Sequence, residues 1–176
     1  MWCRRATIGE MSVVETQSET RRWLSTIARL VLAGVWIAAG LSKITDLDAS
    51  VRAVRAYRLL PELAAQLVGA GQPVIELLLG VLLLVGAGVR AGAVISAVLM
   101  LGFVIGISSA WARGLRIDCG CFGSGGQLAA GESPSYGWDL ARDGGLFVLA
   151  VLLARWPSGR LAVDGWLGGR RVEVEH

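Results

Sequence analysis

The sequence predicts an all-α membrane protein, a bundle of four transmembrane helices with a short interfacial helix between spans one and two. Of the 176 residues, 54% are hydrophobic and only 18% are charged. The mean hydropathy is +0.58, and long stretches of the chain are almost empty of charge. This composition is typical of membrane proteins, because a soluble domain of similar length needs a polar face on most of its elements.

The predicted spans lie at residues 24–41, 73–89, 91–112 and 144–154. The third is uncharged over more than the ~20 residues that cross a bilayer core. Arg29 lies near the start of the first span, where a long side chain can reach back to the headgroups, and Glu76 is the single charge inside the second. The fourth is short, but Trp138 and Trp156 flank it, as indoles do at membrane interfaces.

The segment between the first two spans, "DLDASVRAVRAYRLLPELAAQ", predicts the interfacial helix. At ~100° per residue, the arginines gather on one face and the apolar side chains on the other. The first face holds Arg52, Arg55 and Arg58, and the second holds Ala53, Ala56, Tyr57 and Leu60. Pro61 is expected to end this helix, and Pro73 to start or kink the second span. The arginine face either only anchors the helix at the headgroups or has a further role.

Three regions follow from this pattern: a polar N-terminal segment at 1–22, expected to be disordered, a membrane domain at 23–156 and a charged tail at 157–176. The apolar part of a cleavable signal peptide is an alternative for the first span, because residues 38–40 are small. About 20 mostly polar residues precede that span and further spans follow, which favours a membrane helix. Met11 is an alternative start, which would place Cys3 outside the protein.

The basic residues predict the orientation. Nine lie on the side of the two termini and seven on the opposite side, which favours cytoplasmic termini and an outward-facing loop between the last two spans. The excess of arginine over the single lysine, Lys43, together with abundant alanine and glycine, suggests a GC-rich bacterium, so the expected location is the bacterial inner membrane. No basic run is interleaved with aromatics, so nucleic acid is not an expected partner.

The stretch "RIDCGCFGSGG" in that loop holds Cys119 and Cys121, separated by Gly120. A redox disulfide, a Cu(I) site and two unrelated buried thiols are the possible interpretations. Polar, turn-forming neighbours argue against buried thiols, and a closed zinc site needs four ligands, whereas His176 is the only histidine. Two thiolates suffice for Cu(I). A disulfide across one residue needs the backbone freedom of Gly120 and is strained, as reducible disulfides are.

Other polar residues are candidates for tuning the pair. Glu76 is expected near the outer end of its span at the level of the cysteines, where it either has a function or only pairs with Lys43. Arg142, at the outer start of the fourth span, would lower the pKa of a nearby thiol, or instead pairs locally with Asp139 or Asp143. Because Asp118 precedes Cys119 directly, the sequence slightly favours Cys121 as the attacking thiol.

The order of "ARLVLAGVWIAAGLSK", "YRLLPE", "PVIELLLGVLLL", "RGLRIDCGCFG" and "WDLARDGGL" resembles the methylamine-utilisation protein MauE and its DoxX-like redox-associated relatives. The resemblance implies a four-helix membrane bundle, broadly similar to vitamin K epoxide reductase, that works with an extracytoplasmic thioredoxin-like partner. There is no C-x-x-C and no second cysteine pair, so a relay of two pairs to quinone is in doubt, although a quinone remains possible.

Taken together, the sequence predicts a thiol–disulfide oxidoreductase with Cys119, Cys121, Glu76 and Arg142 at its site. The alternative is a non-catalytic membrane scaffold or a Cu(I)-binding subunit of a larger complex.

Overall fold

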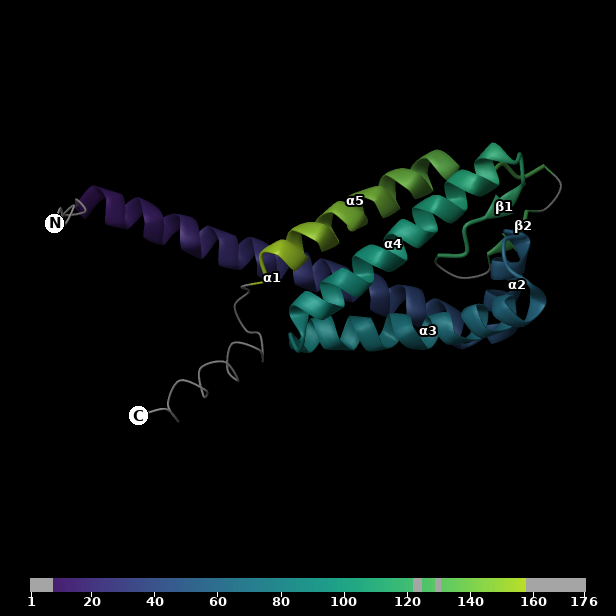
Figure 1. Cartoon of the computed structure of the whole chain (residues 1–176), viewed down its shortest axis with the longest axis horizontal. Helices are drawn as coiled ribbons and strands as arrows, with labels where there is room; N and C mark the ends of the chain where they lie inside the picture. Colours follow the sequence, from purple (N-terminus) through teal and green to yellow (C-terminus); the bar gives the residue numbers. More distant parts are fainter. Residues whose placement is uncertain (1–7, 122–124, 129–130, 158–176) are drawn as a thin grey trace.

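The computed structural model describes residues 8–121, 125–128 and 131–157. This part of the chain is helical apart from one short antiparallel strand pair, so the all-α prediction is confirmed (Figure 1). The elements in chain order are α1 (Ile8–Ile44), α2 (Leu47–Ala56), α3 (Glu62–Val85), α4 (Val89–Ala112), β1 (Ile117–Asp118), β2 (Gly126–Gln127) and α5 (Tyr136–Arg155). Cys3 and His176 lie outside the described residues.

Three of the described helices are long and apolar enough to cross a membrane: Glu19–Ile44 within α1, and the whole of α3 and α4. They correspond to the first three predicted spans. α5 is 20 residues long, but Asp139, Arg142 and Asp143 fall within its first eight residues. Because of these charges α5 is not among the helices with the composition of a span, and a four-span bundle is not established by the fold alone.

Two predicted boundaries differ from the structure. α1 begins at Ile8, so the helix starts well before the predicted first span at residue 24. α3 begins at Glu62, and Pro73 lies inside it and not at its start. A proline inside a helix leaves the carbonyl four residues earlier without its usual donor. Here that carbonyl belongs to Gly69, and the Ser50 hydroxyl donates to it at 2.7 Å. A side chain of α2 therefore satisfies the backbone group that Pro73 frees.

The amphipathic helix predicted between the first two spans is α2. The Asp46 side chain caps it by accepting a hydrogen bond from the Ala49 N–H at 2.8 Å. The predicted arginine face is exposed at Arg52 and Arg55, whereas the alanine face is buried. The helix ends at Ala56, before the expected Pro61. Its buried face packs on α3, where a Cβ on Gly69 would meet the Val51 Cα at 2.6 Å.

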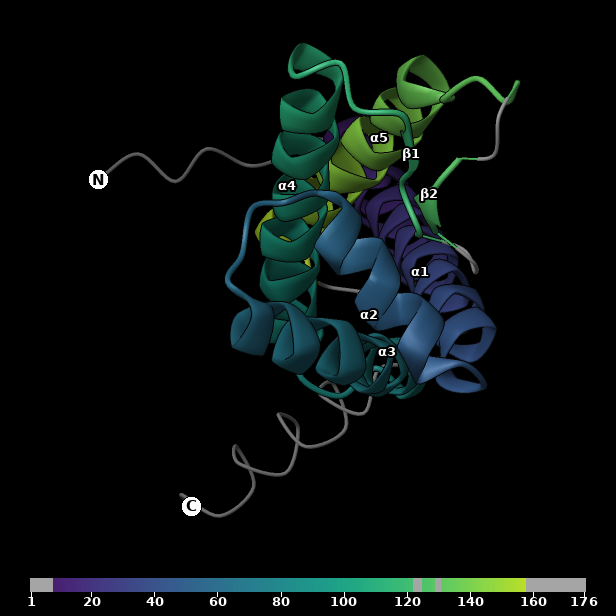
Figure 2. The same cartoon turned by 90° about the vertical axis from the view of Figure 1, so that its right-hand side faces the viewer.

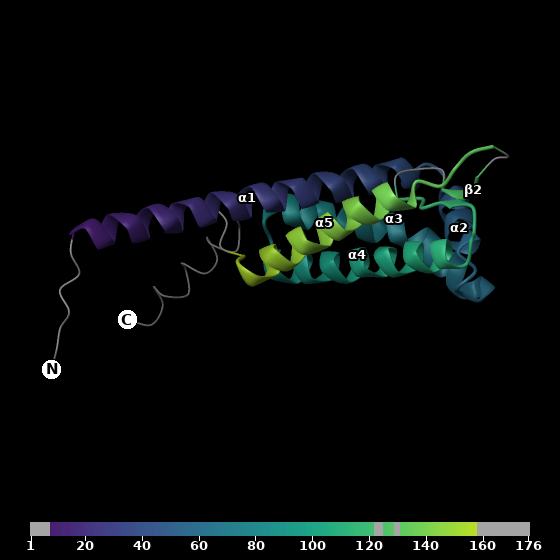
Figure 3. The ribbon, with the colours of Figure 1, turned by 90° about the horizontal axis from the view of Figure 1, so that it is seen from above.

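The helices pack as two neighbouring pairs, α1 with α3 and α4 with α5. The core between them is formed by apolar side chains including Leu32, Trp36, Leu83 and Met100. The first part of α1 and the last turn of α5 lie toward one end, and α2 with the two strands lies at the other (Figures 1 and 3). Figure 2 looks onto this second end, where α2 lies across the helix ends beside the strand pair.

Candidate functional site

The cysteine pair lies in the connection between α4 and α5, on a loop that two glycines allow to fold tightly. Gly120 has φ of 68°, a left-handed conformation that favours glycine. A Cβ built on Gly125 would stand 2.0 Å from the Gly120 Cα, and one built on Gly120 would stand 2.8 Å from the Ala53 Cβ. The two parts of the loop therefore touch through their backbones, and the loop rests on α2.

Two tyrosines hold this loop from opposite sides. The Tyr57 hydroxyl, at the end of α2, donates to the Cys119 carbonyl at 3.0 Å. The Tyr136 hydroxyl, in the first turn of α5, donates to the Leu115 carbonyl at 2.5 Å and accepts from the Ile117 N–H at 3.1 Å. Sequence reasoning missed both contacts. The only available signal is that a phenol placed against an apolar surface needs a partner for its hydroxyl.

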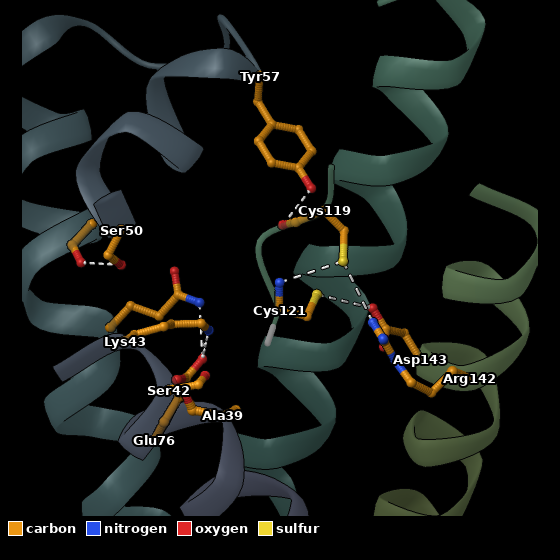
Figure 4. A network of polar contacts seen from close by, with 12 residues as sticks. Ala39, Ser42, Lys43, Ser50, Tyr57, Glu76, Cys119, Cys121, Arg142 and Asp143 are labelled. Atoms are coloured by element: carbon orange, nitrogen blue, oxygen red, sulfur yellow. Dashed lines mark hydrogen bonds and ion pairs between the residues drawn. The ribbon is translucent and has the colours of Figure 1, made fainter. Parts of the chain in front are cut away.

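The two thiols are free and have different surroundings. Cys119 is half-buried, and its Sγ accepts hydrogen bonds from the Cys121 N–H at 3.4 Å and from the Arg142 guanidinium at 3.6 Å. Cys121 is 6% exposed, and its Sγ lies 3.7 Å from Asp143 Oδ2 (Figure 4). Donors thus surround one sulfur, while an acceptor faces the other.

These surroundings separate the pKa values of the pair. Hydrogen bonds from Cys121 and from Arg142 lower the pKa of Cys119 below its ordinary value, against the opposing effect of burial. The pKa of Cys121 is raised by its hydrogen bond to Cys119, by burial and by the negative charges of Cys119 and Asp143. This geometry reverses the order that the sequence favoured, because Arg142 reaches Cys119 and Asp143 faces Cys121. Cys119 is the thiol with the better-stabilised anion.

Arg142 makes both of the contacts that the sequence offered as alternatives. Its guanidinium pairs with Asp143 at 2.9 Å and with Asp139 at 3.4 Å, and also reaches the Cys119 sulfur. The Ser135 hydroxyl donates to Asp139 at 3.0 Å, which fixes the second carboxylate. Arg142, Asp139 and Asp143 all belong to the first turns of α5, and Ser135 directly precedes that helix. One short segment therefore presents a cation and two carboxylates near the cysteine loop.

Glu76 belongs to α3 and is paired separately from the α5 charges. Its carboxylate is 1% exposed and pairs with Lys43 Nζ at 2.6 Å, as the sequence allowed, and Gln72 donates to the same oxygen at 2.9 Å. Glu76 was expected close to the start of its helix, but α3 begins at Glu62, so Glu76 lies ~21 Å along the helix. It nevertheless lines one small cavity together with Cys121 and Asp143. None of the described hydrogen bonds joins Glu76 to a sulfur.

The cysteine pair is not part of a larger metal-binding group in the described part of the chain, where no three histidine, cysteine or acidic side chains are placed to hold one ion. What the site offers is a polarised thiol next to a second, protonated thiol. That arrangement suits attack on a disulfide by the first sulfur and resolution by the second.

Comparison with known proteins identifies the family of the chain. The family model described as "Methylamine utilisation protein MauE" matches residues 21–155. A curated relative, the methylamine utilization protein MauE of Paracoccus denitrificans, is 38% identical over 98 residues, which is 55% of this chain and 53% of that protein. The aligned region thus spans about half the length of this relative. No solved structure matches the chain significantly. The family match extends over most of the chain, from α1 to the end of α5, and the chain is a multi-pass membrane protein of the MauE family.

Proposed function

We propose that this protein is an integral membrane thiol–disulfide oxidoreductase that exchanges the Cys119–Cys121 disulfide with an extracytoplasmic thioredoxin-like protein. The relative that it resembles is named for methylamine utilisation, and we extend that setting to this chain as part of the proposal. The observation that carries the proposal is the asymmetry of the two thiols. Cys119 is half-buried and receives hydrogen bonds on its sulfur, whereas Cys121 is buried beside a carboxylate.

In the reducing direction, the Cys119 thiolate attacks a sulfur of the partner's disulfide. A mixed disulfide forms, and the partner's other sulfur leaves as a thiolate. Cys121 then loses its proton and attacks the Cys119 sulfur, which releases the partner's second thiolate. The net change is two electrons moved from the cysteine pair to the partner, and the opposite direction follows the same steps in reverse. Asp143 Oδ2, 3.7 Å from the Cys121 sulfur, is placed to take that proton.

Glu76 and Arg142 are positioning residues in this proposal. Arg142 stabilises the Cys119 thiolate through a direct contact. Glu76 acts at longer range, since it lines the same small cavity as Cys121, and Lys43 balances its charge.

For the topology, we propose that α5 is a fourth membrane span. Both termini of the chain would then be cytoplasmic, and the cysteine loop would face the outer side of the bacterial inner membrane. A helix of 20 residues is ~30 Å long, enough for a bilayer core. Trp138 and Trp156, at its two ends, are 72% and 53% exposed, as expected of indoles at interfaces. A membrane-impermeant thiol reagent should label Cys119 in intact, reduced cells. Labelling only after lysis would reverse this topology.

The function itself is tested by trapping. Without the resolving thiol, the mixed disulfide should persist, so Cys121→Ser should accumulate a reductant-sensitive adduct with a thioredoxin-like protein in membranes. Cys119→Ser, the matched control, should accumulate far less, because the remaining thiol is buried and has a raised pKa. The adduct is measured on non-reducing gels, with mass spectrometry of the shifted band.

Two outcomes would contradict the proposal. Trapping by Cys119→Ser alone would exchange the roles of the thiols. If neither variant traps a protein, and the parent co-purifies with copper that both substitutions abolish, the protein is instead a Cu(I)-binding or scaffold subunit.

A further inference from the structure

A second cavity of about 310 Å³ lies on the side of the cysteine loop away from α5, between α2, α3 and α4. Most of its lining is apolar, with Val54, Leu99 and Phe103 among the lining residues, and no charged residue is among the described residues that line it. Cys119 and Gly120 form part of its wall. A cavity of this size is within the range that holds a small organic ligand. Cys119 therefore borders a space suited to an uncharged molecule.

The rim of this cavity faces the lipid side of the bundle. Several aliphatic side chains that line it are exposed in the isolated chain: Leu59 is 52% exposed, Val68 is 46% exposed and Val98 is 64% exposed. Val68 and Val98 belong to helices with the composition of membrane spans, so these surfaces contact hydrocarbon in a bilayer. A ligand that enters here comes from the membrane and has to be lipid-soluble.

One polar group in the lining suits a carbonyl oxygen: Gln72 carries two amide hydrogens, and only one of them is donated to Glu76, at 2.9 Å. The Ser50 and Tyr57 hydroxyls donate their hydrogens to the Gly69 and Cys119 carbonyls (Figure 4). Toward a ligand these two hydroxyls can therefore only accept a hydrogen bond. Two glycines of α4, Gly102 and Gly106, line the cavity without adding a side chain to it. A mostly apolar lining with one amide donor suits an uncharged ring that carries a carbonyl oxygen.

We infer that this cavity binds an isoprenoid quinone, which oxidises the Cys119–Cys121 dithiol. The inference rests on the proposed exchange function, because exchange requires an electron acceptor or donor for the pair. In the step, the two thiols lose two protons and two electrons and form the S–S bond. The quinone takes up both electrons and both protons and becomes a hydroquinone. One cysteine pair suffices, because Cys119 borders the quinone cavity and Cys121, two residues further on, can complete the disulfide.

The test uses the full-length protein in lipid nanodiscs, with decylubiquinone as the probe. The reduced protein should lose two free thiols for each quinone reduced, with a rate that saturates as the quinone concentration rises. Gly102→Leu fills the cavity without disturbing the helix, since a Cβ at this position meets no atom within 4 Å. It should raise the half-saturating quinone concentration at least tenfold. Gly34→Leu, on the exposed face of α1 and equally free of contacts, is the control and should change it less than twofold.

Binding is measured separately from chemistry with the Cys119→Ser/Cys121→Ser protein and an azido-derivative of the same quinone. Photolabelling should fall on α4 near Val98 and Phe103, and should decrease in Gly102→Leu. The quinone inference is overturned if oxidation does not saturate, or if Gly102→Leu and Gly34→Leu behave alike. If the partner is trapped normally while quinone neither binds nor oxidises, only this inference fails. If no partner is trapped while quinone still oxidises the pair, the exchange proposal fails alone.

Discussion

Two clusters of buried charge occupy this bundle, and they are built differently. Lys43 and Glu76 come from α1 and α3, and their side chains are only 2% and 1% exposed. Arg142 pairs with carboxylates of its own helix, is 22% exposed and also contacts a sulfur. The first cluster joins two helices, whereas the second joins a helix to a reactive loop.

This difference suggests that the Lys43–Glu76 pair contributes mainly to the stability of the bundle, whereas Arg142 contributes mainly to the properties of the cysteine site. A buried ion pair between helices is costly to break, because the remaining charge is left in an apolar environment. Local pairs within one helix contribute little to holding helices together. Arg142 contacts the Cys119 sulfur in addition to its two carboxylates, whereas Lys43 pairs with Glu76 and reaches no sulfur among the described hydrogen bonds. Substitutions in the two clusters should consequently change different observables.

The largest effect is expected at the inter-helix pair. Lys43→Met should lower the free energy of unfolding by about 3–5 kcal/mol, because it leaves the Glu76 carboxylate buried without its cation. Unfolding is followed by helicity in a denaturing-detergent titration. Lys43→Met combined with Glu76→Met should recover most of the loss.

The matched control is Arg55→Met, which removes one partner of an exposed pair. Arg55 and Glu62 have side chains 44% and 60% exposed, and the change should cost less than about 1 kcal/mol. Equal losses for Lys43→Met and Arg55→Met would remove the distinction drawn between the two clusters.

A smaller, chemical effect is expected at Arg142. Arg142→Gln removes a hydrogen bond and a positive charge from the Cys119 sulfur, so the pKa of Cys119 rises toward its ordinary value. Alkylation of Cys119 at neutral pH should slow by about tenfold, because a smaller fraction of the thiol is ionised. The alkylation rates of parent and variant should converge at high pH, where Cys119 is ionised in both proteins.

Arg52→Gln is the control for this experiment, because Arg52 is exposed at the same end of the molecule and pairs only weakly with Asp46 at 3.6 Å. Its pH profile of alkylation should superimpose on that of the parent. A parent-like profile for Arg142→Gln would instead make Arg142 a purely structural residue.

The smallest effect on the chemistry of the thiols is expected at Glu76. Glu76→Gln preserves the shape of the side chain and leaves the Lys43 charge unbalanced, which favours a thiolate and hence the reduced pair. The reduction potential should become less negative by about 10–30 mV, measured by equilibration with glutathione buffers. A shift below about 10 mV, less than 1 kcal/mol for two electrons, would leave Glu76 with the stability role alone.

Sequence reasoning located the helices well because hydropathy is a local property. The apolar runs of α1, α3 and α4, and the exposed arginines of α2, follow directly from residue order. The position of Pro73 did not, because a proline inside a helix needs a donor from elsewhere, and Ser50 of α2 supplies it. α5 was predicted only in part: its helix is present, but the charged residues in its first turns weaken the hydropathy signal of a membrane span.

For the candidate site, the sequence was a better guide to which residues lie close together than to which of the two cysteines is the attacking thiol. Proximity of Arg142 to the cysteine loop and the pairing of Lys43 with Glu76 were both offered as possibilities, and both contacts are present. The hydrogen bonds favour Cys119 as the attacking thiol, the reverse of the order that the sequence slightly favoured, because Arg142 of α5 donates to the Cys119 sulfur. This orientation depends on the left-handed conformation of Gly120 between the two cysteines. A three-dimensional turn of this kind leaves no periodic signal in the sequence.

The contact between Gly120 and Gly125 has one more consequence. These backbones meet while both cysteines are free thiols, so packing closes the loop without any covalent bond. In the proposed exchange, oxidation of the pair would add an S–S bond to a loop that is already closed, and reduction would remove the bond without opening the loop. The proposed cycle would therefore require little movement of the membrane helices.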